Sequence, residues 1–469
     1  MDGVLMTLPH AAPRGPAPPG LRLEWTDSPE QERLVADADF EPGSLVLREE
    51  FLLRGPAELP PLAMFRPVPA EVGTVEIQGE PGFPRAVIFD NEHMKLLFEF
   101  LNSETEIQQE VLAMQDSMHP ASETMQSTTK VAEWLISQEL PWLEGLDFLS
   151  LSRLLRLFCV NSHPCKAAGS TSGLLKWGTM INHSCLPNVV YSSVESADGD
   201  AGVDGCEEGR FEGHFRACRP IKAGDVLGVS YMKLQVALAP LTQRRRMLWY
   251  LKGFLCECDR CRFEAANGDP SRVLPCAGNA TNCAGKMKMT RCLSGLNSLG
   301  TDASDALDGF SCTSCGSRAM REQVELEAEL SHAVLGALCA RWSGLKSAKE
   351  ALWELQARVE GELHHDHFAV QGLRLLFLAL EADEILKGKG EHDGQQWLRE
   401  LNRVSCWHES IRPGQNGDLM LMLSFKSLAP ALRKLKGEHG KSDPESLEAL
   451  DRSASTVLSM DDAWDKLPE

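Results

Sequence analysis

The spacing of apolar residues predicts short strands in the first half of the chain and amphipathic helices in the second. Within residues 34–47 a Pro-Gly pair separates two apolar runs, which indicates a strand, a turn and a second strand. We expect this segment to form a hairpin. Residues 189–194, 210–217 and 225–231 carry three further strand patterns.

Helical spacing also occurs between the strand candidates. Two helices are expected in an insert over residues 56–145. The apolar face of the first consists of Met94, Leu97, Phe98 and Leu101. The second begins near Ser103, and its apolar face consists of Ile107, Val111, Leu112 and Met118. The dense apolar run at 148–160 predicts a buried helix. A further helix opens at Arg244-Arg245-Arg246 and reaches toward Phe254, and its basic run is typical of a solvated face.

Beyond Met320, leucine and valine recur at helical spacing in four stretches. These stretches are 326–338, 345–363, 368–386 and 419–432. Antiparallel helix pairs stacked in a solenoid-like array are the natural interpretation. The charged segment from Gly437 and the proline-rich leader at 9–20 are expected to be loosely ordered.

Composition narrows the class of protein. With 469 residues, 43% of them hydrophobic, the chain can bury two or three cores. We find no run of eighteen apolar residues and no signal-peptide pattern, so we expect no membrane span and a cytosolic or nuclear location. A formal charge of −20 argues against direct binding of nucleic-acid phosphates and suits a basic, lysine-bearing partner.

The chain has 15 cysteines, and without secretory features they are expected to be reduced thiols or metal ligands. Cys256, Cys258 and Cys261 place three thiols within six residues, and a tetrahedral structural zinc requires a fourth ligand from elsewhere. A second candidate zinc site consists of Cys276, Cys283, Cys312 and Cys315, with Cys292 as an alternative ligand.

The polar stretch Asn182-His183-Ser184-Cys185-Leu186-Pro187-Asn188 lies between apolar runs and, taken alone, is a loop between two strands. Downstream, Ser230-Tyr231 is followed by the Cys256-x-Cys258-x-x-Cys261 motif. In that order these elements resemble the SET domain of protein lysine methyltransferases, and within that family the SET–MYND (SMYD) branch. The resemblance covers roughly residues 22–55 and 150–320, with a weaker similarity in the C-terminal helices.

The resemblance implies an S-adenosylmethionine-dependent methyltransferase that acts on a lysine of a histone or another protein. It implies that Asn182, His183 and Asn161 contact the cofactor and that Phe254 stacks on its adenine. Tyr231 would orient the methyl group and the amine.

The resemblance also implies that His163 and Tyr231 wall the lysine channel. Cys185 would be the fourth ligand of the first zinc. The cluster Leu363-His364-His365-Asp366-His367 contains possible metal ligands, but SMYD tails carry a similar motif at a helix junction, so we interpret it as structural.

The chain departs from the family pattern at three places. Gln31-Glu32-Arg33 stands where a cofactor-binding Gly-x-Gly is usual, His163 replaces an aromatic residue, and Lys252 replaces a tyrosine, for which Tyr250 is a possible substitute. A MYND zinc finger is not expected, because the first cysteine of the chain is Cys159.

The expected fold is α+β, with an all-β SET core, a threaded central loop, a helical insert, a cysteine-rich zinc region and a tetratricopeptide-like helical domain. The divisions are 1–21 leader, 22–55 first SET strands, 56–145 insert, 146–255 SET core, 256–320 post-SET zinc region, 321–436 helical domain and 437–469 tail. Two hypotheses follow. The first is an active lysine methyltransferase, and the second is a degenerate SET scaffold that binds peptides or partners through its helical tail.

Overall fold

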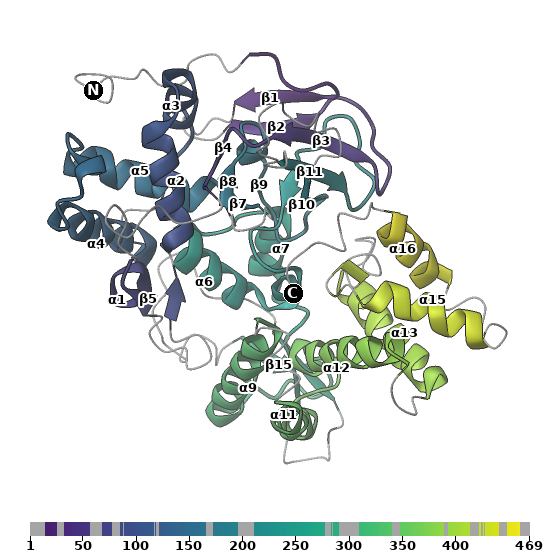
Figure 1. Cartoon of the computed structure of the whole chain (residues 1–469). Helices are drawn as coiled ribbons and strands as arrows, with labels where there is room; N and C mark the ends of the chain where they lie inside the picture. Colours follow the sequence, from purple (N-terminus) through teal and green to yellow (C-terminus); the bar gives the residue numbers. More distant parts are fainter. Residues whose placement is uncertain are drawn as a thin grey trace.

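A computed structural model describes residues 15–25, 32–56, 68–76, 85–87, 89–116, 118, 122–165, 172–195, 211–276, 283, 285–289, 309–339, 348–388, 393–412, 422–423, 425, 427–439 and 448–459. Figure 1 shows most of the strands gathered between two groups of helices, one from the first third of the chain and one from the last. Gln31, Cys292 and most of the leader lie outside the described residues.

Small sheets form the core that was predicted as SET-like. The strands of this core are β1 (Leu21–Trp25), β2 (Glu32–Ala36), β3 (Leu45–Glu50), β4 (Leu53–Arg54), β7 (Ser162–Pro164), β8 (Ser172–Leu174), β9 (Asn182–His183), β10 (Val189–Glu195), β11 (Phe211–Ala217) and β12 (Gly228–Val229). They form four sheets, with the strand orders β1-β2, β10-β11-β3, β4-β8-β7 and β12-β9. Strands β9 and β12 are parallel, and the other pairs are antiparallel. The strand predicted at 225–231 is therefore reduced to two residues.

The hairpin expected over residues 34–47 is wrong in its pairing. Its two strands form, but β2 pairs with β1 and β3 pairs with β11. The segment around Leu34 is fully buried, and the backbone of residues 225–227 bonds to its second edge, as in the bond from Leu227 N to Leu34 O. Because both edges of β2 are occupied, the Pro-Gly turn connects two sheets and does not close a hairpin.

The described part of the insert is mostly helical, as expected. It contains α1 (Ala70–Gly73), α2 (Asn91–Asn102), α3 (Thr105–Leu112), α4 (Glu123–Ser137) and the short hairpin of β5 (Thr74–Glu76) and β6 (Arg85–Val87), which was not predicted. Helix α3 ends at Leu112, so Met118 does not continue its face. The predicted buried helix is α5 (Phe148–Asn161), whose N-terminus is capped by the Asp147 carboxylate.

The basic run at the start of α6 (Leu241–Lys252) is not a solvated face. The Arg244 side chain is completely buried and forms an ion pair with Glu264 of α7 (Asp259–Asn267). A buried guanidinium needs such a partner, since an unpaired charge in the interior is costly. The tertiary partner on α7 therefore reverses the expectation that local composition suggested.

The C-terminal region is helical, as the periodicity predicts. It contains α9 (Arg321–Cys339), α11 (Lys349–Glu362), α12 (Phe368–Leu386), α13 (Gly394–Ile411), α15 (Leu428–His439) and α16 (Glu448–Ser459). Helix α13 was not predicted. The expected loose order after Gly437 is wrong for α16, because Leu450, Ala454 and Val457 are buried in the same core cluster as α15.

Ligand atoms of His364, His365 and Asp366 lie within 4.8 Å of one another, so these three residues are a candidate metal site, and the structural interpretation of the histidine cluster is supported for His367 alone. His367 caps the N-terminus of α12, and its buried Nε2 lies 3.0 Å from a carboxylate oxygen of Glu327.

In the parts of the chain that the structure describes, no helix is long and apolar enough to cross a membrane.

Candidate active site and metal centres

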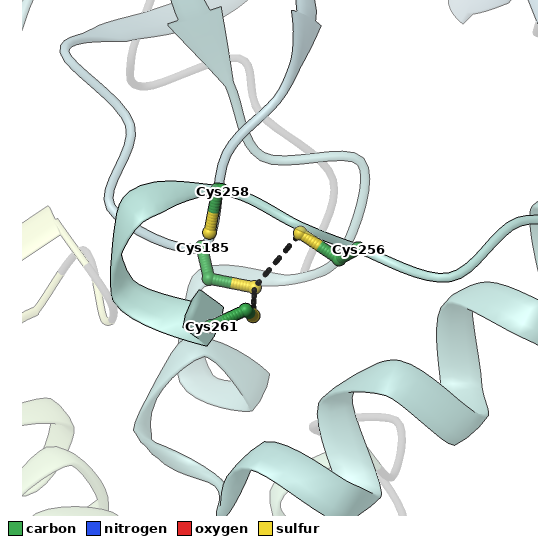
Figure 2. Close-up of side chains that lie close together, drawn as sticks. All are labelled: Cys185, Cys256, Cys258 and Cys261. Carbon is green, nitrogen blue, oxygen red and sulfur yellow. Dashed lines mark hydrogen bonds between the residues drawn. The ribbon is translucent and has the colours of Figure 1, made fainter. Parts of the chain in front are cut away.

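The structure brings Cys185 to Cys256, Cys258 and Cys261, although 71 residues separate Cys185 from Cys256. The four sulfur atoms lie within 4.8 Å of one another, and Cys185 Sγ is 3.5 Å from Cys261 Sγ and 3.9 Å from Cys256 Sγ. Figure 2 shows the four side chains converging: Cys185 comes from a loop, Cys256 and Cys258 from the segment before α7 (Asp259–Asn267), and Cys261 from α7 itself. Thiolates bound to one zinc at about 2.3 Å are separated by about 3.8 Å, so the arrangement fits a tetrahedral zinc.

Buried charges surround this cysteine cluster. Arg260 donates hydrogen bonds to the Cys185 carbonyl oxygen at 3.3 Å and to Glu264 at 2.8 Å, and Arg244 also contacts Glu264. Burial opposes ionisation of Glu264, but the charges of Arg244 and Arg260 lower its pKa to about 2. The carboxylate therefore stays charged and fixes both arginines beside the cysteines.

The second cysteine set also converges. Sulfur atoms of Cys276, Cys283, Cys312 and Cys315 lie within 4.8 Å of one another, with 3.5 Å between Cys276 and Cys315 and 3.8 Å between Cys283 and Cys312. They lie around the sheet of β13 (Val273–Pro275), β14 (Lys286–Met289) and β15 (Phe310–Cys312). The four thiols fit a second zinc, as the spacing predicted.

Three predicted site residues form a cluster beside the first cysteine set. The ring centroid of His183 is 5.4 Å from that of Tyr231 and 6.1 Å from that of Phe254. The rings of Tyr231 and Phe254 are 6.3 Å apart and nearly perpendicular. Burial raises the pKa of Tyr231, and its hydroxyl donates to the Ile181 carbonyl at 3.0 Å, so the phenol remains protonated at neutral pH.

Local hydrogen bonds position the polar loop that carries His183. The Asn188 side chain accepts from Gly228 N at 2.7 Å and donates to the Val226 carbonyl, and Ser184 N donates to the Val229 carbonyl. Because Asn188 and Gly228 are buried, these bonds satisfy polar groups that would otherwise be costly. The loop is thereby attached along the segment that leads to Tyr231.

The other predicted site residues make contacts outside the cluster of His183, Tyr231 and Phe254. Asn182 donates to the Glu32 carbonyl at 3.3 Å, and Asn161 donates to the carbonyls of Gln115 and Leu157. The His163 ring packs against Tyr191 and Phe215, with centroids 5.1 and 6.0 Å away. These positions leave the cofactor and channel roles of Asn161, Asn182 and His163 as predictions.

Sequence reasoning missed one residue of this region, Glu49, and identified Lys252 as a departure from the family pattern without predicting its contact. Glu49 on β3 accepts hydrogen bonds from the backbone N–H groups of Trp177 and Gly178, just before the polar loop, and burial raises its pKa to about 7. Lys252 Nζ lies 5.9 Å from the centroid of the Tyr231 ring. Nothing in the local sequence separates Glu49 from its neighbour Glu50, and a lysine at the end of a helix is ordinarily exposed.

Comparison with known proteins supports the class of fold. Residues 33–232 match the SET domain family. Within that class it is similar to Histone-lysine N-methyltransferase SET5 of Saccharomyces cerevisiae (strain YJM789), with 26% identity over 162 residues. This match covers 32% of the chain and spans 26% of the relative's length.

Among solved structures, a match is found to the SET domain of LSMT bound to lysine and AdoHcy. The match covers 95% of this chain and 86% of that chain, with 11% sequence identity and a TM-score of 0.32. At this degree of similarity the ligands of that protein say nothing about this one.

Proposed function

We propose that the protein is an S-adenosylmethionine-dependent protein-lysine N-methyltransferase whose substrate is a lysine of a histone or another protein. The observation that carries the proposal is the approach of His183 and Tyr231, which lie in the region that matches the SET domain family, to Phe254 and to the Cys185 cluster. The similarity to a histone-lysine N-methyltransferase supports the same reaction class.

The chemistry requires a neutral acceptor amine. A free lysine with a pKa of about 10.4 resists deprotonation at pH 7 by roughly 4.6 kcal/mol, and a narrow apolar channel reduces that cost by desolvating the ammonium. The cofactor, when bound, supplies the methyl group. Tyr231, whose phenol stays protonated, orients the amine through its hydroxyl and is not a base.

In this proposal His183 and Asn182 hold the cofactor, and Phe254 packs on its adenine. The proposed zinc at Cys185, Cys256, Cys258 and Cys261 is structural, since four thiolates leave no open coordination position. It joins the polar loop to the segment that carries Phe254, so metal binding would organise the cofactor site.

We extend the proposal to the finer classification. The chain would belong to the SET–MYND-like branch without the MYND finger, with a threaded central loop and a tetratricopeptide-like array from α9 to α16 that offers a surface for protein partners. A location in the cytosol or nucleus is proposed with it. Direct contact with nucleic acid is not expected from the charge of −20.

Calorimetric titration with S-adenosylmethionine tests the proposal before any substrate is identified. We expect one binding site in the wild type and at least tenfold weaker binding in Phe254→Ala. Phe263→Ala is the matched control, because Phe263 is 62% exposed on α7 and should leave binding unchanged. A wild type that binds no cofactor would refute the enzyme and favour the degenerate scaffold.

A further inference from the structure

Lys252 is the last residue of α6 and stands where the family resemblance leads one to expect a tyrosine. Its ammonium does not extend into solvent. Nζ donates a hydrogen bond to the Cys159 carbonyl at 2.8 Å and a longer one to the Val160 carbonyl at 3.5 Å. Both carbonyls belong to the last turn of α5, where orphan carbonyl groups and the helix dipole attract a cation.

The same ammonium faces the proposed active site. Nζ is 5.9 Å from the centroid of the Tyr231 ring, which is within the range of a cation–π contact. Lys252 thus contacts both the end of α5 and Tyr231. The end of α5 continues directly into β7, which carries His163, so one side chain connects two walls of the site.

The electrostatic environment is consistent with this geometry. Burial lowers the pKa of Lys252, while the Cys159 thiol acts in the opposite direction. Burial also lowers the pKa of His163 to about 4, with a smaller contribution in the same direction from the Lys252 charge. His163 is therefore neutral at pH 7, and Lys252 is the cation that faces this part of the site.

We propose that Lys252 is a positioning residue of the methyltransferase site: its ammonium clamps the end of α5 against Tyr231 and places a positive charge beside the substrate amine. This inference rests on the proposed function. The clamp holds the wall that bears His163 at a set distance from Tyr231. The charge favours the neutral form of an incoming lysine, because like charges repel.

The proposal predicts a pH dependence. Among the described residues, the titratable groups that face Lys252 are the Cys159 thiol on α5, His163 on β7 and the Tyr231 phenol. The charge of Asp90, at the start of α2, raises the pKa of Cys159. Burial raises the pKa of both Cys159, to about 12, and Tyr231, so neither ionises near neutral pH. Loss of the ammonium should therefore raise the pKa of the bound substrate amine and move the acid limb of the kcat profile to higher pH by about one unit.

The test compares wild type with Lys252→Met, which is unbranched, one heavy atom shorter and uncharged, and with Lys252→Arg, which retains the charge. Lys387→Met is the matched control, since Lys387 also precedes a glycine at a helix end but is 52% exposed. We expect Lys252→Met to lower kcat at least tenfold and to shift the acid limb, with cofactor affinity within twofold of wild type. Lys252→Arg should restore most of both, and Lys387→Met should change neither.

A second measurement does not depend on activity. The chain has 3 tyrosines, so ring-carbon NMR of tyrosine-labelled protein gives few signals, and Tyr231→Phe assigns one of them. In Lys252→Met the Tyr231 signal should shift while that of Tyr191 stays. An unchanged Tyr231 signal together with an unchanged pH profile would overturn the proposal.

Two outcomes separate this inference from the proposed function. If the wild type transfers no methyl groups, the proposed function fails, and the NMR shift still decides whether Lys252 contacts Tyr231. If Lys252→Met does not fold, Lys252→Tyr, which introduces the aromatic residue usual in the family, replaces it. An active Lys252→Tyr with the wild-type acid limb would show that the charge has no role.

Discussion

The backbone N–H of Tyr231 donates a hydrogen bond to Nδ1 of His183 at 3.0 Å. Because Nδ1 is the acceptor, the ring proton of the neutral imidazole lies on Nε2, which is 3.3 Å from Cys185 Sγ. His183 therefore links the proposed catalytic tyrosine to the proposed zinc ligand. The proposed metal centre and the proposed methyl-transfer site are therefore joined through one side chain.

This link makes zinc content the first prediction. The intact protein should hold two zinc equivalents, Cys185→Ser should retain one, and Cys312→Ser should also retain one. Elemental analysis of purified protein measures this. Cys406→Ser is the control, since Cys406 is exposed and belongs to neither cluster. A Cys185→Ser variant with both equivalents would exclude the shared site.

The second prediction concerns the Tyr231 hydroxyl. Tyr231→Phe should lower kcat at least tenfold and leave cofactor affinity nearly unchanged, because the ring still packs against His183 and Phe254. The melting temperature should fall slightly, since the buried Ile181 carbonyl loses the hydroxyl that donates to it. Methylation of a lysine-rich protein mixture gives the rate. Tyr250→Phe tests whether the neighbouring tyrosine takes the role instead, and we expect it to act as wild type. Equal rates for wild type and Tyr231→Phe would make Tyr231 a core residue only.

The third prediction follows from Glu49. The pKa of Glu49 in the folded protein is about 7, above the ordinary glutamate value of 4.5, because burial penalises the carboxylate more than the N–H groups of Trp177 and Gly178 stabilise it. The folded state therefore binds more protons between these values, and stability should fall as pH rises from about 4.5 to 7, by roughly 1–3 kcal/mol.

Glu49→Gln should remove that part of the pH dependence. Melting temperatures of the two proteins between pH 5.5 and 8 give the comparison, and the difference between them should change up to about pH 7 and then level off. Glu50→Gln is the control, since Glu50 is the exposed neighbour on β3. Parallel curves for wild type and Glu49→Gln would show that Glu49 ionises normally.

The fourth prediction tests the buried ion pair. Arg244→Met leaves Glu264 with Arg260 as its remaining partner and should destabilise the protein by about 3 kcal/mol. Arg262→Met, on the exposed side of α7, should change stability by no more than about 0.5 kcal/mol. Urea unfolding compares the two. An Arg244→Met variant as stable as Arg262→Met would mean that the buried charges are compensated in another way.

Much of the architecture was predictable because its signal is local. The regular leucine and valine spacing determines α9 and α12, since one helical face must be buried whatever it packs against. The three thiols of Cys256, Cys258 and Cys261 lie so close in sequence that a metal is the natural explanation. The fourth ligand, Cys185, followed from a family resemblance and not from spacing.

Other features depend on partners that are distant in the chain. A strand pattern in the sequence does not specify the partner strand. In the structure β1 pairs with one edge of β2, and the backbone of residues 225–227 bonds to the other edge. A charged residue such as Arg244 is expected at the surface from its sequence alone, but the carboxylate of Glu264, twenty positions further along the chain, makes its burial possible. Lys252 contacts α5 and Tyr231, and Glu49 contacts the backbone just before the polar loop. All these partners are distant in sequence, so the residues next to Lys252 and Glu49 do not predict these contacts.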